Sequence, residues 1–183
     1  MRILVWGFLV LVCLSTDARA QTPESRGTVA GIVGAGRTWD DEGGLGTGPV
    51  VGGRVDWRVF GQTSIEASID SLSHDRSGGF FEAEGRTTFL GVSAVQRFGT
   101  GAVRPYLLGG LHLASHSGST TFDDVRIERD STDFGYHFGG GIAFKVGERF
   151  ELGPEARFYM IQPENDSDPT MAYWIGFRVG LRF

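Results

Sequence analysis

The sequence predicts an all-β fold, an eight-stranded antiparallel up-and-down transmembrane β-barrel, and three observations lead to it. Eight segments alternate between apolar and polar side chains, which is the pattern of strands with one apolar face. The polar breaks between these segments are alternately long and short, as in a barrel with short turns at one rim and longer loops at the other. The N-terminal segment is typical of an export signal.

Residues 1–20 have the features of a cleavable secretory signal peptide. Arg2 supplies a positive charge, residues 3–14 form an apolar run too short to span a membrane as a helix, and residues 18–20 offer a small-x-small cleavage site. An uncleaved N-terminal anchor helix is the alternative, but no long helical pattern follows. We expect a signal peptide at residues 1–20, a short N-terminal arm at residues 21–27 and the barrel at residues 28–183.

The composition suits an exported, glycine-rich β protein. Cys13 is the one cysteine and lies in the predicted signal, and Val12 before it does not suit a lipoprotein signal, so neither disulfides nor a lipid anchor are expected. The signal takes two arginines and one aspartate from totals of 17 basic and 22 acidic side chains, which leaves 15 and 21. This acidic balance, together with export, argues against nucleic acid as a partner. The 29 glycines suit tightly curved strands.

Each strand is expected between two breaks in the alternation. The eight strands are predicted at residues 28–39, 49–60, 63–73, 82–98, 103–116, 133–146, 149–161 and 170–183. Short turns are predicted at residues 60–62, 99–101 and 147–148, each with a glycine. Long polar loops are predicted at residues 40–48, 74–79, 117–132 and 162–169. Both ends of the barrel then lie on the side of the short turns, which is the periplasmic side.

The first four strands carry charges on one face and apolar side chains on the other. The second and third alternate most cleanly, with valines, isoleucines and Trp57 on the apolar face. The first and fourth alternate less cleanly, and Gln96 is expected to face outward near a rim. The charged residues predicted to face inward on these strands are Arg37, Arg54, Asp56, Arg58, Glu66, Asp70 and Arg97.

The last four strands follow the same rule, and the terminal strand is the clearest example. From Met171 to Phe183 the odd positions are apolar, with aromatic residues toward both ends, and the even positions are mostly small or cationic. A strand of about 9–11 residues with this pattern can cross a membrane with its apolar face toward lipid. The residues predicted to face inward on these strands include Arg104, Tyr106, His112, His137, Lys145, Glu151, Glu155, Arg157, Tyr159 and Arg178.

The convergence of charges on one face decides what lies on each side of the barrel. A soluble barrel has an apolar interior, and burying so many ions there costs several kcal/mol for each one without a partner. Turning the same ions toward lipid costs about 2–4 kcal/mol each at the midplane of the membrane. A polar lumen in which acids and bases pair is the least costly arrangement. A soluble lipocalin-like barrel is the alternative fold.

The strand number, the alternation, the loop asymmetry and the ending Val179-Gly180-Leu181-Arg182-Phe183 carry a family resemblance. The chain resembles the small eight-stranded outer-membrane barrels of Gram-negative bacteria, the OmpA/OmpX/OmpW-like group. The resemblance implies an outer-membrane location, contact with lipid and lipopolysaccharide, and binding of periplasmic chaperones and the barrel-assembly machinery during biogenesis. It also implies a C-terminal assembly signal, here Tyr173, Ile175, Phe177, Val179, Leu181 and Phe183.

The inward charges are the first candidate site. The predicted lumen charge network consists of Arg54, Glu66, Asp70, Arg104, Glu155, Arg157 and Arg178. An eight-stranded barrel is just wide enough inside for side chains. The network therefore has two interpretations, a packed polar core that stabilises the barrel or a narrow ion pathway that opens when ion pairs exchange partners.

The histidines are the second candidate site. His112 and His116 share a face but lie roughly 13 Å apart on a strand, too far to chelate one metal, whereas His137 can approach His112. Some small barrels are lipid A-modifying hydrolases with a serine, a histidine and an acid near the outer rim. Ser115, Ser117, His116 and Asp133 lie in the right part of this chain, but adjacent strand residues point to opposite faces, which works against a Ser–His hydrogen bond.

The acidic segment after the fifth strand is the third candidate site. Asp123, Asp124, Glu128, Asp130 and Asp133 offer carboxylates to a hard divalent cation, but without EF-hand spacing, and a solvated outer loop is the more common interpretation. The sequence therefore predicts an outer-membrane barrel with a structural or surface-interaction role, no catalysis, no cofactor and an unidentified surface ligand. The alternatives are a narrow conduit for ions or small hydrophobic molecules and, third, a rim-sited lipid A-modifying hydrolase.

Overall fold

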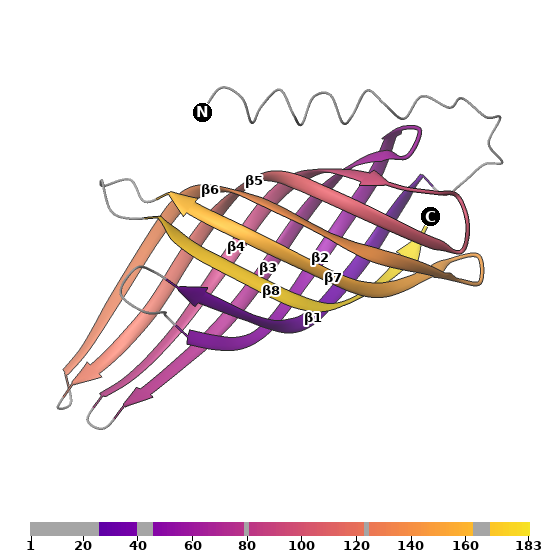
Figure 1. The fold of residues 1–183 in the computed structure, drawn as a ribbon. Coiled ribbons are helices and arrows are strands. Elements are labelled where there is room, and N and C mark those ends of the chain that lie inside the picture. Colours follow the sequence, from indigo (N-terminus) through magenta and orange to yellow (C-terminus); the bar gives the residue numbers. More distant parts are fainter. Residues whose placement is uncertain (1–25, 40–45, 79–80, 123–124, 163–168) are drawn as a thin grey trace.

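A computed structural model describes residues 26–39, 46–78, 81–122, 125–162 and 169–183 as one closed barrel (Figure 1). Each strand is hydrogen-bonded antiparallel to the next, and the first pairs with the last, so the predicted fold class is confirmed. The strands are β1 Gly27–Trp39, β2 Gly46–Phe60, β3 Thr63–Gly78, β4 Phe81–Arg97, β5 Val103–Phe122, β6 Val125–Val146, β7 Phe150–Gln162 and β8 Thr170–Arg182. The predicted signal peptide lies outside the described residues.

The barrel closes where β1 meets β8. Twelve consecutive pairs join the two strands, from Thr28 with Arg182 to Trp39 with Met171. Gly34 and Gly176 face each other in this register, and a Cβ on either would collide with the backbone of the partner strand. Glycine therefore permits the close strand contact that closes the barrel. Among the described residues, no helix is long and apolar enough to cross a membrane.

The three short turns lie at one end of the barrel, as expected. They join β2 to β3, β4 to β5 and β6 to β7, and each contains a glycine with positive φ, at Gly61 (53°), Gly99 (80°) and Gly147 (64°). Side chains rarely adopt this backbone conformation, whereas glycine does so at little cost. The tight turns therefore depend on the three glycines that the sequence places between strands.

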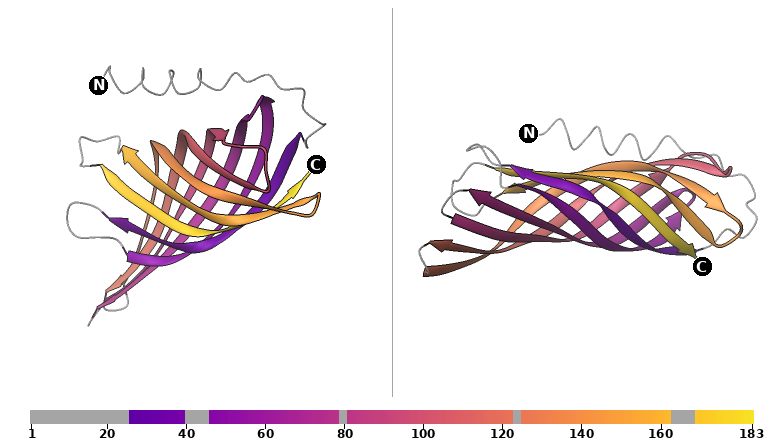
Figure 2. Two further views of the ribbon diagram at one scale, coloured as in Figure 1. Left: turned by 45° about the vertical axis from the view of Figure 1, so that its right-hand side comes forward. Right: turned by 90° about the horizontal axis from the view of Figure 1, so that it is seen from below.

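The opposite end of the barrel is longer than the sequence predicted. The predicted loops at residues 74–79 and 117–132 are wrong, because β3 continues to Gly78, β5 to Phe122, and β6 begins at Val125. With 20 residues in β5 and 22 in β6, these strands far exceed the length needed to span a membrane. Strands β3 to β6 project beyond the rest of the barrel (Figures 1 and 2). Beyond the membrane a strand needs no apolar face toward lipid. Its hydrogen bonds to the neighbouring strand can therefore continue where the alternation of apolar and polar side chains ends.

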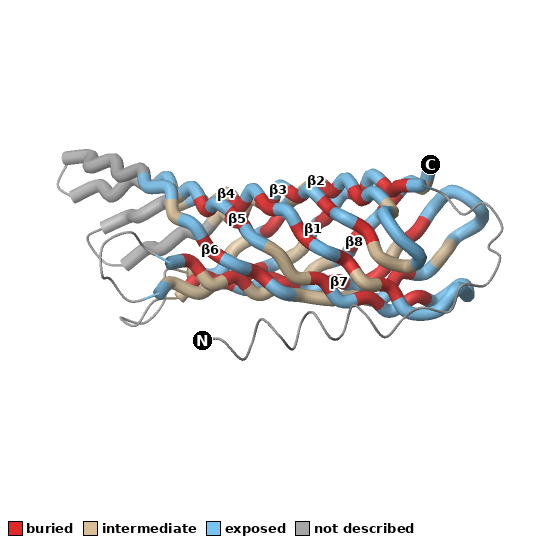
Figure 3. Tube along the Cα trace, turned by 90° about the horizontal axis from the view of Figure 1, so that it is seen from above, coloured by how far each residue is buried: buried red, intermediate tan, exposed pale blue. Residues whose placement is uncertain are grey.

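Wherever the structure describes the burial of strand residues, buried and exposed positions largely alternate (Figure 3). The exposed positions are largely Val, Leu, Ile and aromatic residues, and the inward positions hold the charges, so the barrel is apolar outside. One orientation was predicted wrongly: Arg37 is exposed on the outer face, and Thr38 is the buried neighbour. Small residues fill both faces of this part of β1, so its alternation does not distinguish them.

Aromatic side chains gather on the outer face near both ends of the barrel. Trp39 packs edge-on against Phe158 and Tyr173 at the end with the long strands, with ring centroids 5.7 and 5.4 Å apart. At the end with the short turns, Trp57 lies 6.0 Å from Phe183. Two aromatic girdles of this kind are typical of a barrel that crosses a membrane, where they lie at the two interfaces with water.

Candidate functional site

The centre of the lumen holds a network of ion pairs in which Glu66 is the hub. Glu66 on β3 is fully buried and forms an ion pair with Arg157 on β7 across the barrel. Its second oxygen lies 3.3 Å from Arg178 on β8, and the Nε of Arg54 on β2 lies 3.7 Å from the carboxylate. One carboxylate thus joins three arginines from three different strands.

Two further carboxylates complete this centre. Asp70 lies 2.6 Å from Arg54, and Glu155 lies 2.7 Å from the Nε of Arg157 and 3.6 Å from Arg178. We call this set the central network, and its members are Arg54, Glu66, Asp70, Glu155, Arg157 and Arg178. Three positive and three negative side chains balance, which is the condition under which buried ions are tolerated.

Arg104 is the one residue of the predicted charge network that lies apart from the central network. Its guanidinium group donates to Glu151 at 3.0 Å, nearer the end with the short turns. Glu151 also lies 3.3 Å from Arg178, so it links this lower pair to the central network. The structure therefore brings six of the seven predicted residues together and assigns Arg104 a different partner.

Aromatic hydroxyl and indole groups support the central network, and sequence reasoning placed the tyrosines inward without finding this role. The hydroxyl of Tyr159 donates to Asp70 at 2.6 Å, and that of Tyr106 donates to Glu155 at 2.6 Å. The indole of Trp174 donates to the Tyr159 oxygen at 3.3 Å. Arg54 and Arg157 lie over the Trp174 ring, 5.5 and 5.9 Å from its centroid, within the range of cation–π contacts.

An aromatic layer lies next to the central network on the side of the long strands, and it consists of Phe89, His112, His137 and Tyr159. Phe89 stacks on Tyr159 with ring centroids 4.1 Å apart. The ring centroids of His112 and His137 lie 5.6 Å apart, so the two histidines approach each other as expected from the sequence. His137 shares a 2.7 Å hydrogen bond with Ser93, whereas neither ring nitrogen of His112 has a hydrogen-bond partner among the described residues. This layer is a packed plug above the ions.

The predicted hydrolase residues do not assemble as a serine triad. Ser115 and Ser117 are exposed on the face opposite to the less exposed His116. His116 instead shares a 3.0 Å hydrogen bond with Thr87, its cross-strand partner on β4, and lies 3.8 Å from Asp133. The Thr87 hydroxyl is fully buried, so a lipid ester has no access to it. Sequence reasoning missed Thr87 because strand register is needed to find it.

The acidic segment is only partly described. Asp123 and Asp124 lie outside the described residues, and Glu128 and Asp130 belong to β6 instead of the loop in which they were predicted. Asp133 accepts a hydrogen bond from Ser131 at 3.3 Å. Within the described residues, no group of three or more His, Cys, Asp or Glu side chains is arranged to hold a metal ion.

The residues of the predicted assembly signal all face outward along β8. Tyr173, Ile175, Phe177, Val179, Leu181 and Phe183 are exposed on the lipid-facing side of the barrel. The backbone of Phe183 exchanges two hydrogen bonds of 3.0 Å with Gly27, so the last residue is part of the β1–β8 seam. The assembly signal itself stays a prediction. The exposure of these side chains shows that a receptor can reach them and does not identify the receptor.

Comparison with known proteins places this geometry in context. A family model described as outer membrane protein beta-barrel domain matches residues 6–183 of the chain. No curated protein sequence matches significantly.

Several solved structures share the fold at low sequence identity. Neisserial surface protein A is 17% identical with a TM-score of 0.70, over 87% of this chain and 98% of that one. The attachment invasion locus protein Ail of Yersinia pestis is 14% identical with a TM-score of 0.63, over 87% and 99%, and has also been solved with the heparin analogue sucrose octasulfate. The outer membrane enzyme PagL is 20% identical with a TM-score of 0.52, over 82% and 97%. Identities this low establish the fold alone.

Proposed function

Because the chain belongs to the family of outer membrane protein β-barrel domains, we propose that it is a non-catalytic barrel with a closed lumen and a surface-interaction role. The observation that carries the proposal is the central network, in which six buried ions from β2, β3, β7 and β8 occupy the middle of the barrel. The aromatic layer packs directly against it. A solute would have to displace both.

The energetics favour a closed lumen. Separating one arginine from its carboxylate inside a protein leaves an uncompensated buried charge, which costs about 3–5 kcal/mol. Glu66 bonds to two arginines, so opening a path beside it requires several such separations at once. The network therefore acts as a structural core that holds four strands together.

The projecting strands support the surface role. In the described pairings, β3 beyond Leu72 and β6 before Phe134 each pair with one neighbour only, so each offers an edge of backbone donors and acceptors. Such an edge can accept an extended peptide as an additional strand. The neighbouring structure of Ail is that of an attachment protein, and we extend attachment, as a general role, to this chain.

A sulfated ligand like the one bound to Ail does not suit this chain. The sequence pattern assigns four segments to the outer end, and these segments, residues 37–48, 74–86, 117–133 and 162–169, contain 14 acidic and five basic side chains. A polyanion would be repelled by this balance. The partner we propose is a neutral or basic protein surface, and a peptide that adds to a strand edge meets that requirement.

A narrow ion conduit is the second candidate, and the position of Arg54 favours it. Besides its contact with Asp70, Arg54 has Glu66 and Glu155 within 3.7 and 3.8 Å, so it can exchange carboxylates with small movements. Single-channel recording of the protein in planar bilayers tests the two candidates. We expect no steady conductance from the natural chain. A steady conductance that Glu155→Gln or Arg157→Gln abolishes would refute the closed lumen and establish the conduit.

A further inference from the structure

Arg37 places a charged side chain on the outer face of the barrel, where most positions are apolar. It is exposed, and it lies two residues before Trp39 on the same face of β1. Trp39 and Tyr173 belong to the aromatic girdle at the end with the long strands. Short turns face the periplasm in barrels of this kind, and aromatic girdles lie at the membrane surfaces. Arg37 therefore lies at the outer surface of the membrane.

Arg37 has no counter-ion in the described parts of the chain, where it forms neither an ion pair nor a hydrogen bond. The inward arginines differ, since Arg54, Arg157 and Arg178 each meet a carboxylate of the central network. An arginine that faces lipid is costly at the midplane and is tolerated near the interface. An exposed guanidinium group at the membrane surface is therefore available to an anion from the surrounding membrane.

The register of the barrel places a hydroxyl group on each side of Arg37. Arg37 stands opposite Tyr173 on β8 and opposite Thr47 on β2, and both partners are exposed. Residues opposite each other on one face of antiparallel strands have Cβ atoms about 4.5–5.5 Å apart. Because β8, β1 and β2 are neighbours in the ring (Figure 1), the three side chains form a row of donors at the membrane surface. We call this set, Thr47, Arg37 and Tyr173, the outer-rim row.

The outer-rim row borders directly on apolar surface. One outward position nearer the middle of the membrane, the same three strands align exposed apolar residues, which are Ile175, Ala35 and Pro49. The next outward positions hold Phe177, Val33 and Val51, which are also exposed. A ligand that contacts Arg37 can therefore extend along an apolar surface at the same time.

Arg86 provides a comparison, because it has similar neighbours but no apolar surface beside it. It is exposed on the outer face of β4, opposite Ser73 on β3 and Ser117 on β5. One outward position nearer the middle of the membrane, these strands align hydroxyl side chains, which are Ser71, Thr88 and Ser115. A polar row thus separates Arg86 from the lipid-facing surface. Arg37 combines charge, hydroxyl groups and apolar surface, whereas Arg86 combines only the first two.

We propose that the outer-rim row binds a phosphate group of a phosphorylated glycolipid in the outer leaflet of the membrane. The planar guanidinium fork of Arg37 matches the oxygens of a phosphate. The hydroxyl groups of Tyr173 and Thr47 can donate to the remaining phosphate oxygens or bond to sugar hydroxyls. The apolar side chains below the row accommodate acyl chains. A lipid satisfies all three requirements, whereas a soluble anion satisfies only the first two.

Titration of the folded barrel with bisphosphorylated lipid A tests the proposal. The mature chain is studied in a nonionic detergent, and native mass spectrometry measures the apparent affinity for the first bound lipid. Arg37→Gln should weaken binding about tenfold, because charge-assisted hydrogen bonds are lost. Tyr173→Phe keeps the ring of the girdle and should weaken binding about threefold. Arg86→Gln is the matched control, since it removes an equally exposed outward charge, and it should change the affinity less than about twofold.

Two further ligands separate the phosphate from the rest of the lipid. Lipid A without its phosphate groups should bind to the natural chain as weakly as lipid A binds to Arg37→Gln, and inorganic phosphate should not compete. Heat-modifiable migration on gels reports folding, and if Arg37→Gln does not fold, Tyr173→Phe carries the test. Unchanged affinity in the variant that carries the test, equal loss in Arg86→Gln, equal binding of the dephosphorylated lipid, or competition by inorganic phosphate would overturn the proposal. These measurements do not depend on any role of the projecting strands.

Discussion

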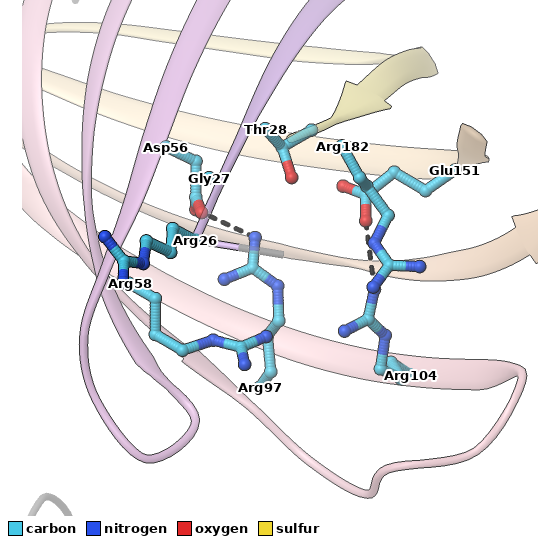
Figure 4. Close-up of a pocket in the computed structure, with 9 residues that line it drawn as sticks. All are labelled: Arg26, Gly27, Thr28, Asp56, Arg58, Arg97, Arg104, Glu151 and Arg182. Atoms are coloured by element: carbon cyan, nitrogen blue, oxygen red, sulfur yellow. Dashed lines mark hydrogen bonds and ion pairs between the residues drawn. The ribbon is translucent and has the colours of Figure 1, made fainter. Parts of the chain in front are cut away.

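The central network and the end of the lumen with the short turns are built from the same residue types in different proportions. In the central network, three arginines meet three carboxylates, and Tyr106 and Tyr159 donate to Glu155 and Asp70. At the end with the short turns, a small pocket (Figure 4) is lined by five arginines and two carboxylates, Arg26, Arg58, Arg97, Arg104, Arg182, Asp56 and Glu151. The two regions are connected through Glu151, which contacts Arg104 below and Arg178 above.

The difference shows how burial decides the structural weight of an ion pair. A balanced and buried set of ions fixes strands that lie far apart in the sequence. Ion pairs nearer to solvent are screened, and each contributes less. Substitutions should therefore affect folding more strongly in the central network than at the end of the lumen with the short turns.

Removing the hub of the central network should have the largest effect. Glu66→Gln leaves Arg157 and Arg178 without their shared carboxylate in a fully buried site, so we expect a loss of about 3–5 kcal/mol in the free energy of unfolding. Urea titration of the barrel in phospholipid vesicles measures it. Glu148→Gln, on an exposed turn, should stay within about 0.5 kcal/mol. A loss under about 1 kcal/mol in Glu66→Gln would show that the network is not a structural core.

Overpacking beside the aromatic layer should have the next largest effect. A Cβ on Gly135 would lie 2.6 Å from the His112 Nε2 and would also collide with the backbone of β7, so Gly135→Ala should cost about 1–3 kcal/mol. Gly31→Ala is the matched control on a strand of the same barrel, since nothing lies within 4 Å of its added Cβ. The same urea titration compares them. Equal stability of the two variants would show that the lumen is loosely packed.

Asp56→Asn should separate the two regions most directly. The substitution weakens the partner of Arg97, but Arg97 keeps Ser64 and lies at the end of the lumen with the short turns, so we expect a loss of only about 1 kcal/mol. The same urea titration measures it. A loss as large as that of Glu66→Gln would show that the two regions contribute equally to the stability of the barrel.

The sequence predicted the ring of strands because lipid and a polar lumen impose opposite demands on alternate residues. This demand ends at the membrane surface, so the alternation said nothing about β5 and β6 beyond it, and loops were predicted where the strands continue. It also fails where both faces are small, which is why Arg37 was placed inward. Alternation reports on the environment of a strand and not on its hydrogen bonding.

The pairing inside the lumen was harder to predict for a geometric reason. Alternation tells which residues face inward, but their height in the barrel depends on the stagger between strands. Arg104 and Glu151 therefore meet below the central network, although the sequence grouped Arg104 with Glu66 and Glu155. The hydrogen bond between Thr87 and His116 depends on register in the same way.

The terminal residue offers the prediction with the smallest effect on stability and a distinct effect on assembly. Phe183→Ala keeps the backbone bonds to Gly27 and removes a ring that is 51% exposed, so stability should fall by less than about 1 kcal/mol. Phe150→Ala removes an equally exposed ring, 52%, from the same rim. If Phe183 belongs to an assembly signal, its variant alone should form the heat-modifiable barrel more slowly in pulse–chase labelling of cells. Equal delay in both variants would mean that aromatic area at the rim, and not the position of Phe183, governs insertion.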